Sequence, residues 1–227
     1  MATSISKQEM RRNPLAEWIG QSIRFIQGHQ MAMIVGSIVI AVGVSVGAAV
    51  WWQHQRREDA ASRLLATALA AAQPEQPGST PKPEESVKAL QQVVKEYPNT
   101  PSAEEALLSI GNDQYATGKI DDALATFDQY LKAFPRGRFR VMAALGKAYA
   151  QEAKGDFQGA AQTLSQTLER SKDNPLDGEV YMSLGRVNEE LKKPDDAMKV
   201  YGQVVEKYPQ TRWAQDAMQR MTALKPK

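Results

Sequence analysis

The chain has 227 residues and a mass of 25.1 kDa, which limits it to one or two domains. It contains no cysteine and two histidines, which excludes disulfides, thiolate metal sites and cysteine nucleophiles and leaves little for a histidine metal cage. The net charge of +2, from 28 basic and 26 acidic residues, includes no charged tail that would indicate a polyanionic partner.

Residues 1–30 form a tail whose second half has an amphipathic pattern. Between residues 14 and 30, one side of a helix would carry the apolar residues Leu15, Trp18, Ile19, Ile23 and Ile26. This pattern predicts a short helix lying in the membrane interface, with a cytosolic helix docked on a partner as the alternative.

Residues 31–52 read MAMIVGSIVIAVGVSVGAAVWW and carry no charge. A helix of this length spans roughly 33 Å, against about 30 Å of bilayer hydrocarbon. Trp51 and Trp52 end the segment, where indole rings favour the headgroup layer. A core helix and a cleaved signal peptide are the alternatives, but the run is long and tryptophans stand where small residues precede a cleavage site. The pattern predicts one uncleaved transmembrane helix and hence contact with the lipid bilayer.

Gly43 and Gly47 lie one helical turn apart within this segment. Small residues at this spacing let two membrane helices approach closely, so they predict a helix-packing surface and a homodimer. The alternative is the ordinary abundance of glycine in membrane helices.

The segment after the span continues as a good helix former. Residues 53–73 are rich in Ala, Leu, Arg and Glu, which predicts a helical extension forming part of a first repeat. Residues 74–84 contain four prolines and a glycine, which predicts a loop.

An internal repeat dominates the chain beyond residue 84. Alanine, an aromatic residue and proline follow both Gly111 and Gly185 at 12, 16 and 24 residues. The middle copy, aligned on Gly146, requires a two-residue insertion before Gly155 and a longer exit turn. The pattern is that of the tetratricopeptide repeat, a helix–turn–helix unit of roughly 34 residues.

Together, these patterns predict an all-α fold with an N-terminal amphipathic helix, a single transmembrane helix and a tetratricopeptide-type solenoid over residues 85–227. Each repeat consists of a first and a second helix. The second helix of the first repeat is expected at residues 85–96, and an amphipathic helix at residues 212–224 should cap the last repeat. Thr100 and Thr211 are expected to be N-caps.

No pattern in the sequence indicates catalysis. His29 and His54 flank the span on opposite sides, and the acidic pairs at residues 121–122 and 195–196 fit the starts of second helices, where negative charge meets the helix dipole. We therefore expect no enzyme, no cofactor, no metal site and no nucleic-acid partner.

Tetratricopeptide solenoids bind partners through the concave wall that their first helices line. Leu108 and Ala144 occupy two positions where the family's carboxylate clamp needs polar residues, so no such clamp is expected. The predicted partner-binding wall consists of Asn112, Tyr115, Lys147, Gln151, Arg186 and Glu189.

The order of tail, anchor, continuing helix and repeat array resembles the YfgM-like ancillary subunits of the bacterial Sec translocon. The local likeness covers residues 28–72, with the glycine-rich anchor and the WWQHQ run. The resemblance implies an inner-membrane protein that links the translocon to periplasmic chaperones. The alternative is a structural subunit or assembly factor of another membrane complex, in envelope assembly, division or respiration.

The basic residues around the span favour an orientation that differs from the periplasmic array implied by the resemblance. Arg56, Arg57 and Arg63 follow it closely, whereas only Arg24 is close before it, which favours a cytoplasmic array. The resemblance and the interfacial helix favour the opposite. We predict a single-pass protein of the bacterial inner membrane with a cytoplasmic N-terminus and a periplasmic array.

Overall fold

The structure is a computed structural model that describes residues 30–71, 83–171 and 173–225. The regular elements of these residues are all helices, which confirms the all-α prediction: α2 (Gln30–Ala71), α3 (Pro83–Glu96), α4 (Pro101–Ala116), α5 (Ile120–Ala133), α6 (Arg140–Ala153), α7 (Phe157–Arg170), α8 (Asp177–Glu190), α9 (Pro194–Lys207) and α10 (Arg212–Leu224). The predicted interfacial helix and His29 lie outside the described residues, as does the predicted loop up to residue 82. Helix α3 begins two residues earlier than expected.

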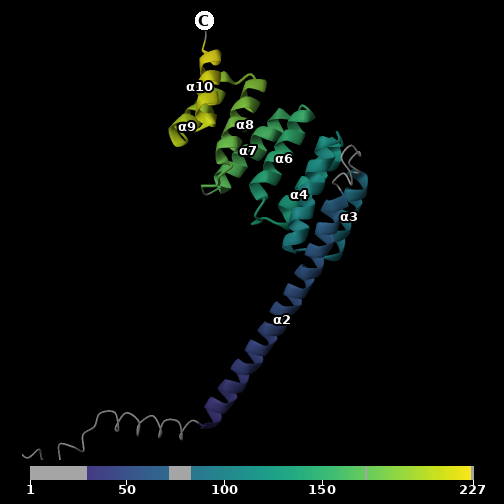
Figure 1. The fold of residues 1–227 in the computed structure, drawn as a ribbon. Coiled ribbons are helices and arrows are strands. Elements are labelled where there is room, and N and C mark those ends of the chain that lie inside the picture. Colours follow the sequence, from purple (N-terminus) through teal and green to yellow (C-terminus); the bar gives the residue numbers. More distant parts are fainter. Residues whose placement is uncertain (1–29, 72–82, 172, 226–227) are drawn as a thin grey trace, which may run out of the picture. The chain divides into compact units, whose positions relative to one another are not determined.

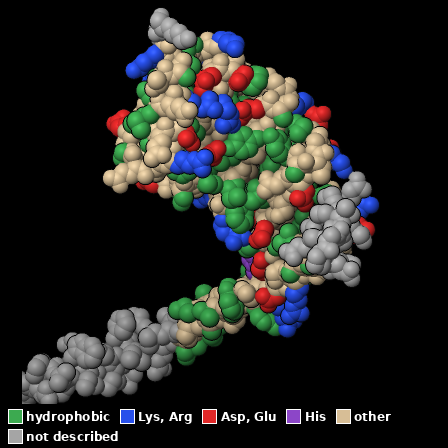
Figure 2. Space-filling view, turned by 45° about the horizontal axis from the view of Figure 1, so that its top comes forward, with side chains coloured by type: hydrophobic (Ala, Val, Ile, Leu, Met, Phe, Trp, Pro, Cys, Tyr) green, Lys and Arg blue, Asp and Glu red, His purple; other side chains and the backbone are tan. Residues whose placement is uncertain are grey.

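The chain divides into two units, residues 1–56 and 57–227. In the first unit, α2 is apolar, and its most hydrophobic 18-residue window has 0% of its residues buried. Figure 2 shows hydrophobic side chains, in green, exposed along this helix. Within the described residues, α2 is the one helix long and apolar enough to cross a membrane. A core helix would be covered by the rest of the chain, so the exposure argues against that alternative.

The second unit begins with the last turns of α2. Leu65 and Ala68 pack there with Leu90 of α3 and Ile110 of α4 in one apolar cluster. The hydroxyl of Ser86 donates a hydrogen bond to the Ala68 carbonyl at 3.2 Å, so the second part of α2 serves as the first helix of the first repeat.

The second helices of the repeats are spaced evenly. Figure 1 shows the helices of the array following one another from α3 to α10. Helices α3, α5, α7 and α9 begin at residues 83, 120, 157 and 194, which is every 37 residues, and each contains 14 residues. A large side chain occupies the same position in each and is fully buried: Leu90, Phe127, Leu164 and Tyr201. The repeat is therefore 37 residues long, three more than the usual tetratricopeptide unit.

This spacing corrects the predicted alignment of the middle repeat. Ala148, not Gly146, lies 37 residues from both Gly111 and Gly185. Each turn within a repeat has three residues, 117–119, 154–156 and 191–193, so there is no insertion before Gly155. The prediction was wrong because it aligned the repeats on glycine as a residue type.

Glycines allow the helices to cross closely at the buried rings. A Cβ atom added at Gly111 or at Gly146 would lie less than 3 Å from the ring of Phe127, and one at Gly185 would lie as close to the ring of Tyr201. Phe127 is thus held between Gly111 of its own repeat and Gly146 of the next repeat.

The last repeat is covered by α10. Trp213, Met221 and Leu224 pack against the cluster that contains Tyr201 and Val204, as predicted for a capping helix. The predicted caps are also confirmed. Thr100 accepts a hydrogen bond from the Ala103 amide at 3.1 Å, and Thr211 accepts one from the Ala214 amide at 3.3 Å.

The turns within the repeats place one residue in the left-handed region at the same position. Gly118 and Gly155 both have φ of 77°, and Lys192 has φ of 58° at the equivalent place in the third turn. A side chain in this region costs roughly 1 kcal/mol that glycine does not.

We expect Lys192→Gly to raise the free energy of unfolding by about 0.5–1 kcal/mol, because it removes this backbone strain. Lys193→Gly is the matched control. It removes the same charge at a residue with φ of −113°, where the side chain causes no backbone strain, so it should not raise the free energy of unfolding. Urea unfolding followed by circular dichroism measures both. Equal effects of the two substitutions would contradict the prediction.

Candidate partner-binding groove

Two cavities lie along the first helices of the second, third and fourth repeats and on α10. Helix α4 contacts α6, and α8 contacts α10, so residues from successive first helices come together. One cavity has a volume of about 460 Å³ and is lined by Tyr115, Tyr149, Glu152, Ala153, Phe157, Arg186 and Glu190. The other has a volume of about 440 Å³ and is lined by Glu179, Met182, Arg186, Trp213, Asp216, Gln219, Arg220 and Ala223. Arg186 belongs to both, so we call the two together the first-helix groove.

Arg186 is held in place at the centre of this groove by Glu152 of α6. Its Nη2 atom lies 3.2 Å from Glu152 Oε1 and its Nε atom lies 3.4 Å from Oε2, so the ion pair is bidentate. Burial lowers the pKa of the guanidinium, but the hydrogen bonds and charge of Glu152 outweigh it and raise the pKa above its usual range. Arg186 therefore stays charged and fixes α6 against α8.

Tyr149 forms the wall beneath this pair. Its hydroxyl donates a hydrogen bond to Glu179 Oε1 at 2.8 Å and lies 3.3 Å from the Ser183 hydroxyl. The Arg186 guanidinium lies 5.8 Å from the ring centroid. Burial raises the pKa of Tyr149, and Glu179 raises it further, so the phenol stays neutral. Tyr115 lies at the open edge of the groove, with 38% of its surface exposed.

The far end of the groove is built by α10. Arg220 Nη1 lies 2.9 Å from Glu189 Oε1, which also accepts the hydroxyl hydrogen of the buried Tyr201. Burial raises the pKa of Tyr201, and its hydrogen bond to Glu189 raises it further. Trp213 provides an aromatic surface beside these groups.

The structure distributes the six predicted wall residues between two roles. Tyr115 and Arg186 line the groove, and Asn112 is exposed outside it. Lys147 pairs with Asp128 of α5 at 2.6 Å, and Gln151 accepts a hydrogen bond from Thr163 at 2.8 Å.

Glu189 is the sixth and pairs with Arg220 behind the groove surface. Four of the six, including Arg186 through Glu152, therefore bind other parts of the array, which leaves their polar groups engaged inside the fold. Whether any of the six contacts a partner stays a prediction.

Several groove residues were not predicted, because the middle repeat was aligned two residues out of register. In the 37-residue register, Tyr149 is equivalent to Asn112 and Arg186, and Glu152 is equivalent to Tyr115 and Glu189. The equal spacing of Gly118 and Gly155 in the turns was the signal that would have placed them.

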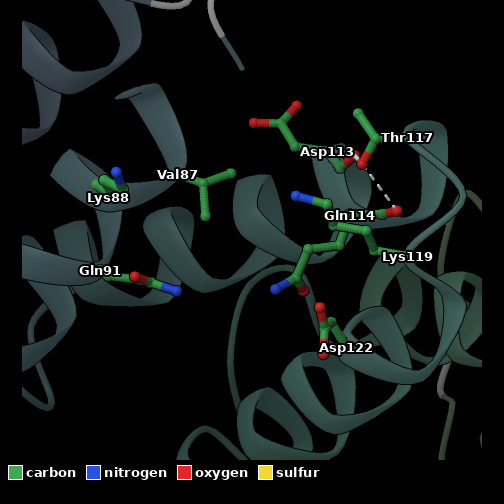
Figure 3. Close-up of a pocket in the computed structure, with 8 residues that line it drawn as sticks. All are labelled: Val87, Lys88, Gln91, Asp113, Gln114, Thr117, Lys119 and Asp122. Carbon is green, nitrogen blue, oxygen red and sulfur yellow. Dashed lines mark hydrogen bonds between the residues drawn. The ribbon is translucent and has the colours of Figure 1, made fainter. Parts of the chain in front are cut away.

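A third cavity, of about 540 Å³, lies between α3 and the turn from α4 to α5 (Figure 3). Its lining is polar apart from Val87 and contains no aromatic side chain. Burial raises the pKa of Asp113 there, while Gln114 accepts a hydrogen bond from Thr126 at 2.7 Å within the repeat. Without an aromatic anchor, this cavity is a weaker candidate for a protein partner than the first-helix groove.

Gly43 and Gly47 lie on an open surface of α2. Nothing in the structure lies within 4 Å of a Cβ atom added at either position. Packing of a second helix against them stays a prediction.

Comparison with known proteins identifies the repeat array. The family model described as "YfiO: Outer membrane lipoprotein" matches residues 80–227. Two curated relatives, both named outer membrane protein assembly factor BamD, come from two strains of Xylella fastidiosa. Each is 24% identical over 137 residues, which is 60% of this chain and 40% of the relative's length.

Solved structures share the fold. A Pseudomonas aeruginosa PilF structure has a TM-score of 0.56 at 15% identity, and the match covers 74% of this chain and 68% of the PilF chain. A tetratricopeptide repeat protein from Parabacteroides merdae has a TM-score of 0.55 at 13% identity, covering 75% and 59%. A MamA structure has a TM-score of 0.52 at 20% identity, covering 63% and 76%. These likenesses confirm the tetratricopeptide-type solenoid.

Proposed function

Since the chain belongs to the YfiO outer membrane lipoprotein family, we propose that it is a membrane-anchored scaffold that binds other proteins of the bacterial envelope. The observation that carries this proposal is the first-helix groove, in which aromatic and arginine side chains are open to solvent. Aromatic residues and arginine are the residue types that contribute most to protein–protein binding.

The anchor in this proposal is α2. Attachment of lipid through a thioether needs a cysteine, and these 227 residues contain none. The family match begins at residue 80, after α2, so it does not bear on how the chain is anchored. An uncovered apolar helix long enough to cross a bilayer supports attachment by a transmembrane helix instead. On this proposal the anchor lies in the inner membrane and the array lies in the periplasm.

Two kinds of complex fit such a scaffold. The relatives named BamD favour an assembly factor for envelope proteins, which is the alternative that the sequence left open. The YfgM-like layout favours an ancillary subunit that links the Sec translocon to periplasmic chaperones. Both place the array outside the inner membrane, and the two differ in which complex co-purifies with the full chain in mild detergent.

The orientation can be tested because the chain has no cysteine of its own. We expect Gln166→Cys, on an exposed position of α7, to react with a membrane-impermeant maleimide once the outer membrane is permeabilised. Ser4→Cys in the N-terminal tail is the control and should react only after the inner membrane is broken. The reverse pattern would place the array in the cytoplasm and overturn the proposed location.

The groove can be tested by site-specific crosslinking in cells. We expect a photoreactive phenylalanine analogue at Tyr115 or Trp213 to yield discrete crosslinked products with other proteins. The same analogue at Gln166, on a second helix outside the groove, is the control. Equal products from all three positions, or products from Gln166 alone, would remove the groove from the proposed function.

A further inference from the structure

The first-helix groove has an excess of negative charge. Four acidic side chains line it and two arginines oppose them: Glu152, Glu179, Glu190, Asp216, Arg186 and Arg220. This local balance differs from that of the whole chain, which has a net charge of +2.

Both arginines are already neutralised by glutamates within the array. Arg186 is paired with Glu152 at 3.2 Å, and Arg220 is paired with Glu189 at 2.9 Å. An acidic ligand would have to displace these internal carboxylates, so the arginines do not favour one.

Asp216 lies 3.8 Å from the Arg212 guanidinium, so Glu190 and Glu179 are the two acidic groups of the groove that have no ion pair within the described residues. Glu190 is exposed at the last residue of α8, and no ion pair is found for it within the described residues. Glu179 accepts a hydrogen bond from the neutral phenol of Tyr149 and has no ion pair within the described residues, and the charge of Arg186, already paired with Glu152, acts on it only through space.

Aromatic side chains surround the same carboxylates. Tyr115 and Phe157 line the cavity that contains Glu190, and Trp213 lines the cavity that contains Glu179. A guanidinium or ammonium group beside a carboxylate and over an aromatic ring gains from both contacts. The remaining lining, including Ala153 and Met182, suits apolar neighbours of that cation.

We propose that the first-helix groove binds a protein segment that presents arginine or lysine side chains between apolar residues, with one cation held by Glu190 and Tyr115. This inference rests on the proposed function and adds the chemical class of the partner. Charge complementarity selects the basic segment, and the aromatic lining provides the apolar contacts.

The test uses the full chain in nanodiscs of phosphatidylcholine, because an arginine peptide would bind anionic lipid by itself. The probe is a fluorescent twelve-residue peptide in which arginine alternates with leucine and phenylalanine, and its partner peptide has glutamate in place of every arginine. Fluorescence anisotropy measures the binding of each peptide, with empty nanodiscs as the blank.

We expect the arginine peptide to bind at least about tenfold more tightly than the glutamate peptide, and to weaken with added salt. Glu190→Gln should weaken it by about threefold to tenfold, and Tyr115→Ala by a similar factor. Glu169→Gln is the matched control, since it removes the same charge from the exposed last turn of α7 outside the groove, and should change binding less than about twofold.

Tighter binding of the glutamate peptide, or equal effects of Glu190→Gln and Glu169→Gln, would overturn the basic class of partner. If groove crosslinks still form in cells, the proposed function stands and only the partner chemistry fails. If they do not form, the proposed function itself fails, whatever the peptides do.

Discussion

Gly185→Leu is expected to lower the free energy of unfolding by roughly 1–3 kcal/mol, because no space exists for a side chain where α8 crosses α9. Even a Cβ atom at this position would lie less than 3 Å from the ring of Tyr201. That ring is fully buried, and its hydroxyl donates a hydrogen bond to Glu189, so the ring cannot move aside without breaking this hydrogen bond. Urea unfolding of the detergent-solubilised chain measures the loss.

Gly202→Leu is the matched control in the next helix. Nothing lies within 4 Å of a Cβ atom there, so the better helix propensity of leucine should leave stability unchanged or slightly raised. If both leucine variants unfold at the same denaturant concentration, the close crossing at Gly185 is not what limits the packing of this repeat.

Removal of residues 212–227 is expected to have a larger effect, because it strips α10 from the last repeat. The truncation exposes the apolar cluster around Met182, Tyr201 and Val204 and removes Trp213 from its place against Gly178. At about 1.5–3 kcal/mol for each large apolar side chain, the loss should reach about 3–6 kcal/mol. We expect a lower melting temperature and aggregation, measured by circular dichroism and light scattering.

A truncation that removes only residues 225–227 is the control, since it leaves α10 and its apolar contacts in the chain. It should melt at the temperature of the complete protein. A chain without α10 that stays monodisperse and melts at the same temperature would show that the last repeat needs no cap.

The fold was largely predictable because its signals are local. An uncharged run of 22 residues, helix formers without glycine or proline, and threonines before helix starts each act over a few residues, and each corresponds to an observed feature of α2, α4 or α10. The register of the middle repeat was not predictable, because Gly146 leaves space for the ring of Phe127 in the neighbouring repeat and not for a side chain of its own repeat. Residue type alone does not reveal which ring a glycine faces.

The groove was only half predictable for a related reason. Sequence places Tyr115 and Arg186 on first helices, but it does not show that Glu152 from another helix neutralises Arg186. Lys147 and Gln151 looked equally available, yet each is bound by the second helix next to it. Which polar side chain remains open to a partner depends on pairings across helices that only the packed array determines.

The 37-residue spacing makes the array modular in length. Excision of residues 120–156 would join the turn after α4 directly to the start of α7, and the following helices would keep their rotational phase. The excised piece contains both Phe127 and Gly146, so the ring and the neighbouring glycine that accommodates it leave together. The shortened chain would set Gly111 against the smaller Leu164. Whole 37-residue units can thus be removed or added without leaving a buried ring that has no glycine to accommodate it.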